Sequence, residues 1–328
     1  MPSEIQTVIE RFRAAIEARD AKQMRYMAQQ WLRIEHMLMG RIENLANTTY
    51  LLQQQGKTVS RSSIYQLEQY RDLLAQVKTE VNRYNRFAAE QISQAQRCYG
   101  LDGIDYTAQT IMAVYADARR HPEPFMRLPE KAIETMIGLA GDGTPLNKLL
   151  MADYQKTVLR MTQTLIDNTA LGINPRITAK QMAVDMSGNL QRTLTIARTE
   201  QIRAFRIAST MSAKESGVVS GWIWRSALQD RTCIACLAMD GTEHGLDEEL
   251  NDHPGGRCLK QWIVKGMPTL QAQSGQEWFN GLGTEKKKDI LGQQKYEAWS
   301  SGAVKFQDFA AITHSDVWGS SVKVAAVG

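Results

Sequence analysis

Residues 221–264, GWIWRSALQDRTCIACLAMDGTEHGLDEELNDHPGGRCLKQWIV, contain two pairs of metal-ligand side chains. Cys233 and Cys236 form a C-x2-C pair, and His253 and Cys258 form an H-x4-C pair further along the chain. Each pair offers two ligands from a tight turn, so one zinc ion would crosslink the two turns. The pattern therefore predicts a structural, tetrahedral zinc site made of these four residues.

Other uses of these thiols stay open at this point. A C-x2-C pair is also typical of a redox site, but no strand-helix-strand pattern surrounds this one. Cys233 and Cys236 could be ordinary buried thiols, or a disulfide if the protein reaches an oxidising compartment. His244, in the same loop, is a spare ligand candidate or a solvated histidine. The loop from Leu237 to Asp252 is polar, so we expect a metal to serve as its core.

Two short apolar segments flank the cysteine loop. Gly221–Arg225 has the alternation of a strand, with Trp222 and Trp224 on one face, and Leu259–Val264 is its expected partner. Residues 274–291 have a helical pattern, and residues from about His314 have a weak pattern that predicts a tail. Trp278, Trp299 and Trp318 would be interface anchors if they face outward.

The first 215 residues are typical of long helices. Apolar residues recur at helical spacing in two stripes, and the segment QQQGKTVSRSS (53–63) between them predicts the turn of a long helical hairpin. The stripes are Met24, Met27, Trp31, Ile34, Leu38, Ile42 and Leu45, and Leu67, Leu74, Val77, Val81, Tyr84 and Phe87. Residues 99–106, YGLDGIDY, carry turn signals. A further helix is expected over 149–169.

A capping box and a glycine predict two more helices after Asn174-Pro175. Thr178 would be the N-cap with Gln181 as its partner, the first helix would end near Met186, and the second would begin after Gly188. The predicted fold is thus mainly α, with a long helical hairpin and a small C-terminal α+β module whose β-hairpin is clamped by a metal. We predict a helical domain over 1–148, a cysteine-containing domain over 149–270, and a C-terminal helix and tail over 271–328.

The bulk composition excludes few functions. The 328 residues carry a net charge of +4, which permits contact with nucleic acid without requiring it. Arg119-Arg120 and Lys286–Lys288 are small basic clusters. No apolar run is long enough to span a bilayer, and the charged N-terminal segment lacks a signal-peptide core, so we expect folding in a reducing cytoplasm.

The usual catalytic motifs are absent from the sequence. It has no GxxxxGK[ST], GxGxxG, HExxH or GxSxG pattern. Zinc deaminases combine an H-x-E element with Pro-Cys-x2-Cys, and the H-x-E of this chain, His121-Pro-Glu123, has no Pro-Cys-x2-Cys after it. A site with three thiolates is usually closed and structural. Glu200 pairs by spacing with Arg203, as helix residues at positions i and i+3 often do. We therefore expect no enzymatic activity and no catalytic residue.

An ordered set of short motifs resembles the head morphogenesis family of tailed bacteriophages, which includes the F protein of phage Mu and gene product 7 of phage SPP1. The set is Ile196-Ala-Arg-Thr-Glu200, Trp224, Asp230-Arg-Thr-Cys-Ile-Ala-Cys236, Asp240-Gly241, His253-Pro254 and Arg257-Cys258. The resemblance covers residues 150 to 295. Where the family often has Pro-x-Cys-Arg-Cys, this chain has Pro254-Gly-Gly-Arg257-Cys258, so four ligands require His253.

The resemblance implies a minor capsid protein of the virion head, assembled in the bacterial cytoplasm. Such a protein would dock at the portal vertex or inner shell and assist head assembly, DNA packaging or DNA delivery. Its partners would be portal protein and major capsid protein, with scaffold protein and packaged DNA as further candidates. The resemblance also implies that Arg198, Glu200, Trp224 and Asp230 are structural anchors, and that Arg198-Thr-Glu200 is a buried polar anchor between its helix and the tryptophan strand. A zinc-dependent hydrolase or transferase, and a zinc-containing nucleic-acid-binding protein, are the alternatives.

Overall fold

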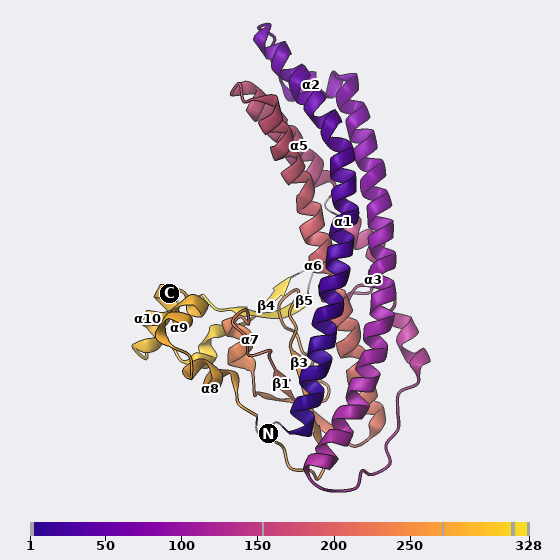
Figure 1. Ribbon diagram of the computed structural model, residues 1–328, viewed down its shortest axis with the longest axis vertical. Coiled ribbons are helices and arrows are strands. Elements are labelled where there is room, and N and C mark those ends of the chain that lie inside the picture. The colour runs from indigo at the N-terminus through magenta and orange to yellow at the C-terminus, as the bar shows by residue number, and fades with distance from the viewer. Residues whose placement is uncertain (1–2, 153, 271, 316–318, 327–328) are drawn as a thin grey trace. The chain divides into compact units, whose positions relative to one another are not determined.

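The computed structural model describes residues 3–152, 154–270, 272–315 and 319–326, and these residues are mainly helical with two small sheets (Figure 1). The predicted fold class is confirmed. Among the described residues the long helices are α1 (Glu4–Gln54), α3 (Glu68–Asp117), α5 (Tyr154–Ala170) and α6 (Pro175–Ser216). The short ones are α2 (Arg61–Gln66), η1 (Glu130–Met136), α4 (Leu146–Met151), α7 (Ile234–Met239), α8 (Gly275–Asn280), α9 (Thr284–Leu291), α10 (Gln293–Ser300) and η2 (Phe306–Phe309).

The chain forms two compact units, and neither is continuous in sequence. Unit 1 contains Met1–Arg19, Gln94–Gly143 and Arg198–Gly328, and unit 2 contains Asp20–Ser93 and Thr144–Ala197. The sequence pattern predicts three consecutive domains instead. Helices α1, α3 and α6 each contribute residues to both units, which is why boundaries drawn along the sequence differ from the units in space.

Unit 2 is built on the predicted helical hairpin of α1 and α3. The α1 stripe is buried as expected, and Trp31 is fully enclosed. Its ring meets Tyr84 of α3 edge to face at 4.9 Å, and the Tyr84 hydroxyl donates to the Met27 carbonyl at 3.1 Å. Along the second stripe Val77 and Val81 are buried as well. The connection includes α2, which begins with a capping box at Ser60 that the sequence prediction missed.

One continuous helix, α6, replaces the two helices predicted after Asn174. The predicted N-cap at Thr178 is wrong because the helix begins at Pro175, where the missing N–H of proline leaves no donor unsatisfied. Asn174 occupies the capping position, and its side-chain oxygen accepts from the Arg176 N–H at 2.9 Å. Gly188 does not end the helix. It lies where a β-carbon would approach the Arg160 guanidinium to 3.1 Å.

In unit 1 the turn predicted over residues 99–106 is wrong, because α3 runs through it without interruption. The two glycines responsible for the turn signal serve close packing instead. A β-carbon at Gly103 would lie 2.4 Å from the Phe205 carbonyl oxygen on α6, and one at Gly100 would lie 2.9 Å from the Ile133 side chain. Glycine therefore lets the two helix backbones approach each other here.

We predict that Gly103→Ala destabilises the protein although alanine is the better helix former. The new methyl group would collide with backbone atoms that move only if α3 and α6 separate, and overpacking of this kind costs about 1–3 kcal/mol. Gly40→Ala in α1 is the matched control, since no atom would lie within 4 Å of the new methyl carbon and the change should stabilise by up to about 1 kcal/mol. Urea unfolding of both variants checks this; a stabilised Gly103→Ala protein would contradict the close packing.

The predicted strand pair belongs to a three-stranded antiparallel sheet in unit 1, with the first strand of the pair at its centre. Its order is β2 (Glu243–Gly245), β1 (Val219–Arg225), β3 (Leu259–Val264). Trp222 lies opposite Trp262, and both are buried with Trp224 in one core that also contains Tyr106 and Phe205. The sheet thus packs on α3 and α6 through its tryptophans.

The C-terminal residues form more structure than the predicted tail. Strands β4 (Ala310–Ser315) and β5 (Gly319–Val324) pair antiparallel, and the Val322 N–H donates to the Asn251 carbonyl at 2.8 Å. The helix predicted over 274–291 is broken at Gly281–Gly283 into α8 and α9. Trp278 and Trp299 are half-buried against a small core around Phe279, and Trp318 lies outside the described residues.

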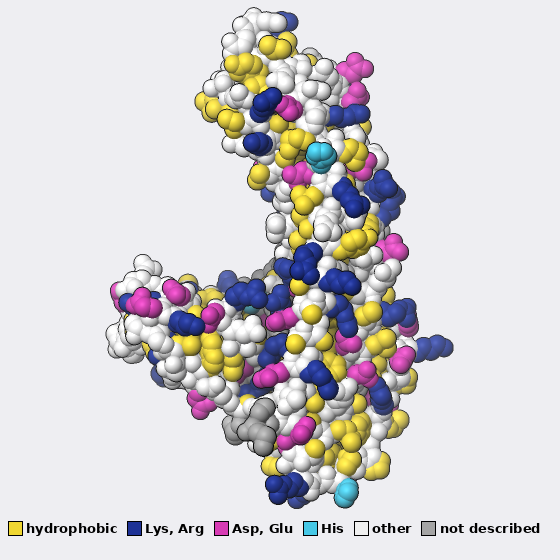
Figure 2. Space-filling model, viewed as in Figure 1, with side chains coloured by type: hydrophobic (Ala, Val, Ile, Leu, Met, Phe, Trp, Pro, Cys, Tyr) yellow, Lys and Arg dark blue, Asp and Glu magenta, His cyan; other side chains and the backbone are white. Residues whose placement is uncertain are grey.

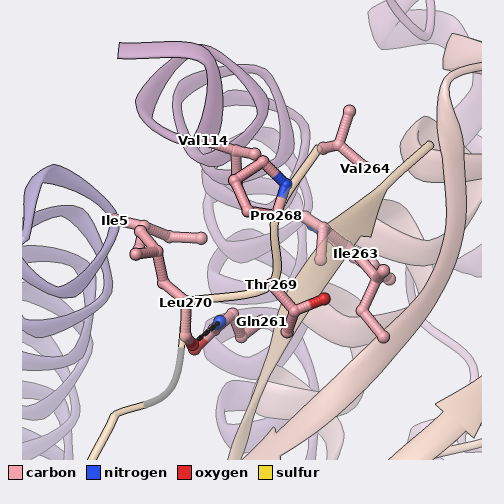
Figure 3. A pocket seen from close by; sticks show the side chains of 9 residues that line it. Ile5, Val114, Gln261, Ile263, Val264, Pro268, Thr269 and Leu270 are labelled. Atoms are coloured by element: carbon pink, nitrogen blue, oxygen red, sulfur yellow. Dashed lines mark hydrogen bonds between the residues drawn. The ribbon is translucent and has the colours of Figure 1, made fainter. Parts of the chain in front are cut away.

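A small cavity marks where the segment after β3 packs on the helices of unit 1 (Figure 3). Ile5 and Val114 from the helices face Pro268 and Leu270, and Gln261 donates to the Leu270 carbonyl at 3.4 Å. The cavity has a volume of about 10 Å³, which is room for one water molecule at most. This cavity is therefore a packing feature. In the described part of the chain, no helix has the length and apolar character needed to cross a membrane.

Candidate functional site

The first ligand pair lies at the start of α7. Cys233 is the N-cap of this helix, and its sulfur accepts a hydrogen bond from the Cys236 N–H at 3.4 Å. A thiolate at a helix N-terminus is stabilised by the free N–H groups there. Cys233 is half-buried and Cys236 is fully buried in the tryptophan core. The short helix therefore presents both sulfurs on one side.

The second pair belongs to a turn between Asp252 and Cys258 that a buried ion pair holds in shape. The Arg206 guanidinium of α6 meets the Asp252 carboxylate through two bonds of 2.7 and 2.6 Å, and it also donates to the Cys258 carbonyl at 2.7 Å. Asp252 in turn accepts from the Cys258 N–H at 3.2 Å. Gly256 is required here because a β-carbon would lie 2.2 Å from the Asp252 oxygen.

The fold brings three of the four predicted ligands into one group. The sulfurs of Cys233 and Cys236 and a ring nitrogen of His253 all lie within 4.8 Å of one another. Cys258 lies outside that mutual distance but adjoins the group, because its thiol hydrogen-bonds with Cys236. The four-ligand set remains a prediction, and three of its members are in place.

Electrostatics within the group favour one thiolate. A hydrogen bond from Cys236, helped by one from His253, lowers the pKa of the Cys233 thiol to about 4. Hydrogen bonds with Cys233 and Cys258, together with burial, raise the pKa of the Cys236 thiol. The hydrogen bond to Cys233 raises the pKa of His253 to about 9. Without metal, these shifts favour the thiolate form of Cys233, the protonated ring of His253 and the protonated thiol of Cys236.

These residues fit a zinc ion. Soft sulfur donors with one imidazole are the ligands of structural zinc sites. A tetrahedral zinc ion needs these ligand atoms close to one another, as they are here. Ligation would require His253 and the buried thiols to lose their protons, so zinc binding would release protons and weaken as the pH falls. When bound, zinc would supply a crosslink between α7 and the turn that Arg206 holds.

The loop between the cysteine pairs contains more apolar core than its composition suggested. Leu237 is fully buried and Leu250 nearly so, which corrects the expectation that a metal alone would serve as the core. His244 is neither a member of the ligand group nor solvated. Its ring stacks on Trp222 at 4.2 Å and contacts Glu248 at 3.1 Å.

The four predicted anchors occupy different environments. Trp224 is buried in the sheet core, whereas Asp230 is exposed and contacts Lys286 at 3.3 Å. Arg198 is half-buried on α6. Glu200 is buried, as expected, but it faces the Gly141 backbone N–H and Arg203 at 3.4 Å, not the tryptophan strand. Glu200 therefore holds the end of the unit 1 segment Gln94–Gly143, directly before the chain enters unit 2 at Thr144.

The buried carboxyl of Glu200 gives a testable pH dependence. Burial raises its pKa to about 7, so between about pH 4.5 and 7 the folded state holds a proton that the unfolded state has lost. Stability should therefore fall as the pH rises through this window, by about 3 kcal/mol for this group. Glu200→Gln should remove that fall and be more stable than the wild type above about pH 7.

Glu215→Gln, an exposed change on the same helix, is the matched control. Denaturant unfolding of the three proteins across this pH range makes the comparison. Parallel pH profiles for Glu200→Gln and the wild type would show that Glu200 does not carry the proton.

A cleft of about 570 Å³ lies beside the ligand group. One wall is α6 from Thr199 to Lys214, and the other includes residues 247–255 with His253. Lys260 at its base is 3% exposed, donates to the Thr210 hydroxyl at 3.0 Å and lies 4.5 Å from the Trp222 ring. Burial lowers the pKa of Lys260 to about 8. The lysine is thus held by structural contacts.

Comparison with known proteins identifies the region that contains this site. Residues 160–259 match the family described as Phage Mu protein F like protein. This confirms, for that segment, the resemblance to phage head morphogenesis proteins drawn from the motifs. The segment is less than half of the chain, yet it contains α6, β1 and all four predicted ligands. No curated protein and no solved structure matches the chain.

Sequence reasoning missed the residues that shape the site. Arg206 and Asp252 are separated by 46 positions, and neither stands out by type or spacing. The one available signal was the position of Asp252 directly before His253, followed by the paired glycines 255 and 256. Thr199, within the motif Ile196–Glu200, helps to position the turn that contains His253, because its hydroxyl accepts a hydrogen bond from the Gly255 N–H at 3.0 Å.

Proposed function

We propose that this protein is a minor component of a tailed-phage head that acts as a docking piece. The family match over residues 160–259 supports this most strongly, because that segment contains the motif-bearing part of α6, the tryptophan strand and the cysteine loop. On this proposal the protein is part of the virion, assembled in the bacterial cytoplasm. Its partners are then portal protein, major capsid protein and scaffold protein.

The arrangement of the ligand group supports a structural use of the metal. Cys236 and Cys258 are buried in the same core as the three sheet tryptophans, so a bound zinc would adjoin side chains that already hold the sheet on α6. Arg206 fixes the turn that presents His253, and α7 with its N-cap positions the sulfurs of Cys233 and Cys236. A docking module needs a surface of constant shape, and these contacts provide one.

The cleft beside His253 is the observation that favours an enzymatic role. Its volume lies within the range of small-molecule sites. Against that role, four of its charged groups already pair with one another: Arg206 with Asp252 at 2.6 Å, and Lys214 with Asp247 at 2.6 Å. A set of three thiols and one imidazole also leaves no open coordination position when all four bind. We therefore favour a non-enzymatic protein.

Quantitative mass spectrometry of purified mature particles and of DNA-free heads tests the proposal. A structural head component should be present in both, at a constant ratio to portal protein. Absence from both kinds of particle would contradict the proposal, and the cleft would then be the place to search for activity. Presence in mature particles alone would show that the protein enters with DNA and is not a docking piece of the empty head.

A further inference from the structure

The chain's positive charge is concentrated in unit 2. That unit has 16 basic and 10 acidic residues, whereas unit 1 has 23 basic and 25 acidic residues. The formal net charges are therefore +6 and −2, which together give the +4 of the whole chain. The weak overall charge thus conceals a basic helical unit.

The surface of unit 2 is more basic than its net charge indicates. Of its 16 basic residues 15 are exposed, while 4 of its acidic residues are exposed among those described. The exposed basic residues are Lys22, Arg25, Arg33, Arg41, Lys57, Arg61, Arg71, Lys78, Arg83, Arg86, Lys148, Lys156, Arg160, Arg176 and Lys180. The exposed acidic residues are Glu68, Asp72, Glu90 and Asp167.

Several acidic side chains of unit 2 are used inside the helical bundle. Glu35 accepts from the Ser187 hydroxyl at 2.9 Å, Asp185 accepts from Thr164 at 2.6 Å, and Glu43 pairs with Arg176 at 3.1 Å. Glu35 and Asp185 therefore join helices and do little to neutralise the outer surface, whereas Glu43 neutralises the exposed Arg176. Within the described residues, Arg41, Lys78 and Arg86 form no ion pair, and Arg33 contacts the neutral Gln30 amide at 3.4 Å.

The charges are spread along rods, not gathered in one pocket. On α1, Arg25, Arg33 and Arg41 recur every eight residues, or about two helical turns, over roughly 24 Å of helix. On α3, Arg71, Lys78 and Arg86 recur at intervals of seven and eight. Figure 2 shows dark-blue side chains along the face of α1 and α3 that this view presents. A long, linear polyanion is the partner that fits such a distribution.

We propose that the outer helical surface of unit 2 binds the phosphate backbone of duplex DNA without sequence preference. Duplex DNA offers one charge for about every 1.7 Å of its axis, so lysines and arginines at any spacing along a helix can each find a phosphate. Lys286–Lys288, the cluster first suggested by the sequence, is less suitable because Lys286 and Lys288 contact Asp230 and Glu285.

The test compares two full-length variants that remove the same charge. The first carries Arg33→Gln, Arg41→Gln, Lys78→Gln and Arg86→Gln in unit 2, and the second carries Arg120→Gln, Lys286→Gln, Lys287→Gln and Lys288→Gln in unit 1. Binding to a random-sequence duplex is measured by fluorescence anisotropy from low to physiological salt. The side chains are exposed except for Lys287 and Lys288, which are half-buried, and circular dichroism checks that both variants fold.

We expect the wild type to bind with a steep salt dependence. The unit 2 variant should lose affinity about tenfold or more and have a shallower slope of log K against log salt by up to about 4, because each lost phosphate contact removes about one counterion. The unit 1 variant should bind as the wild type does. No binding at low salt, or a larger loss in the unit 1 variant, overturns the proposal. The proposal is also overturned if poly-glutamate, added at the same concentration of negative charge as the duplex, displaces the duplex from the protein. None of these outcomes bears on presence in the particle.

Discussion

Cys236→Ser in the full-length chain is expected to abolish stoichiometric zinc binding and to destabilise the sheet module. Cys236 is the buried member of the ligand group and contacts both Cys233 and Cys258, so its loss breaks the connection between the two turns. Structural zinc contributes about 10–16 kcal/mol of apparent binding free energy in small domains, so even a fraction of this would be a large loss. We expect the unfolding temperature to fall by about 10 °C or more.

Cys98→Ser is the matched control for this prediction. Cys98 is an exposed free cysteine on α3, so its replacement removes a thiol without touching the ligand group. Thermal unfolding followed by tryptophan fluorescence is a suitable readout, because Trp222, Trp224 and Trp262 lie in the core that contains Cys236. If both variants keep equal zinc content and equal unfolding temperatures, the four residues are ordinary thiols and a histidine.

Arg206→Met is expected to cost about 3–5 kcal/mol, because it leaves the Asp252 carboxylate buried without a partner. Asp252 is 3% exposed as a side chain and Arg206 is 11% exposed, so water would not replace the lost contact. The Cys258 carbonyl would lose its donor as well. Zinc affinity should also fall, since the turn that presents His253 would no longer be held.

A second variant separates the ion pair from general packing. Adding Asp252→Asn to Arg206→Met removes the unpaired charge, so the double variant should recover part of the lost stability. Lys214→Met breaks the exposed pair with Asp247 on the same helix and should change stability little. Denaturant unfolding of the zinc-loaded proteins checks this. A double variant that is less stable than Arg206→Met alone would contradict the role of the buried charge.

The candidate metal ligands could be predicted from the sequence because zinc sites use two local pairs. Cys233 with Cys236, and His253 with Cys258, are each close in sequence, so spacing alone predicts them. The structure groups Cys233, Cys236 and His253, and the four-ligand set stays a prediction. The partner strands around them were equally visible, since alternating tryptophans mark a half-buried strand. Arg206 and Asp252 were not visible, because an ion pair between distant segments leaves no local pattern.

The errors in secondary structure share a physical origin in tertiary packing. Gly100 and Gly103 indicated a turn, but α3 stays helical because those positions face Ile133 and α6 at close range. The sequence offers two possible helix starts, a capping box at Thr178 and the Asn174-Pro175 pair, and the helix begins at Pro175 with Asn174 as its cap. The strands β4 and β5 have little apolar pattern of their own, and contact with Asn251 helps to place them.

X-ray absorption at the zinc edge of the full-length protein tests the metal-clamped module most directly. The account predicts one zinc per chain with three sulfur ligands at about 2.3 Å and one nitrogen ligand at about 2.0 Å, the distances of structural sites. His253→Ala should remove the nitrogen contribution and leave the sulfur contribution in place. A shell dominated by oxygen, or no bound zinc after loading at neutral pH, would contradict the account.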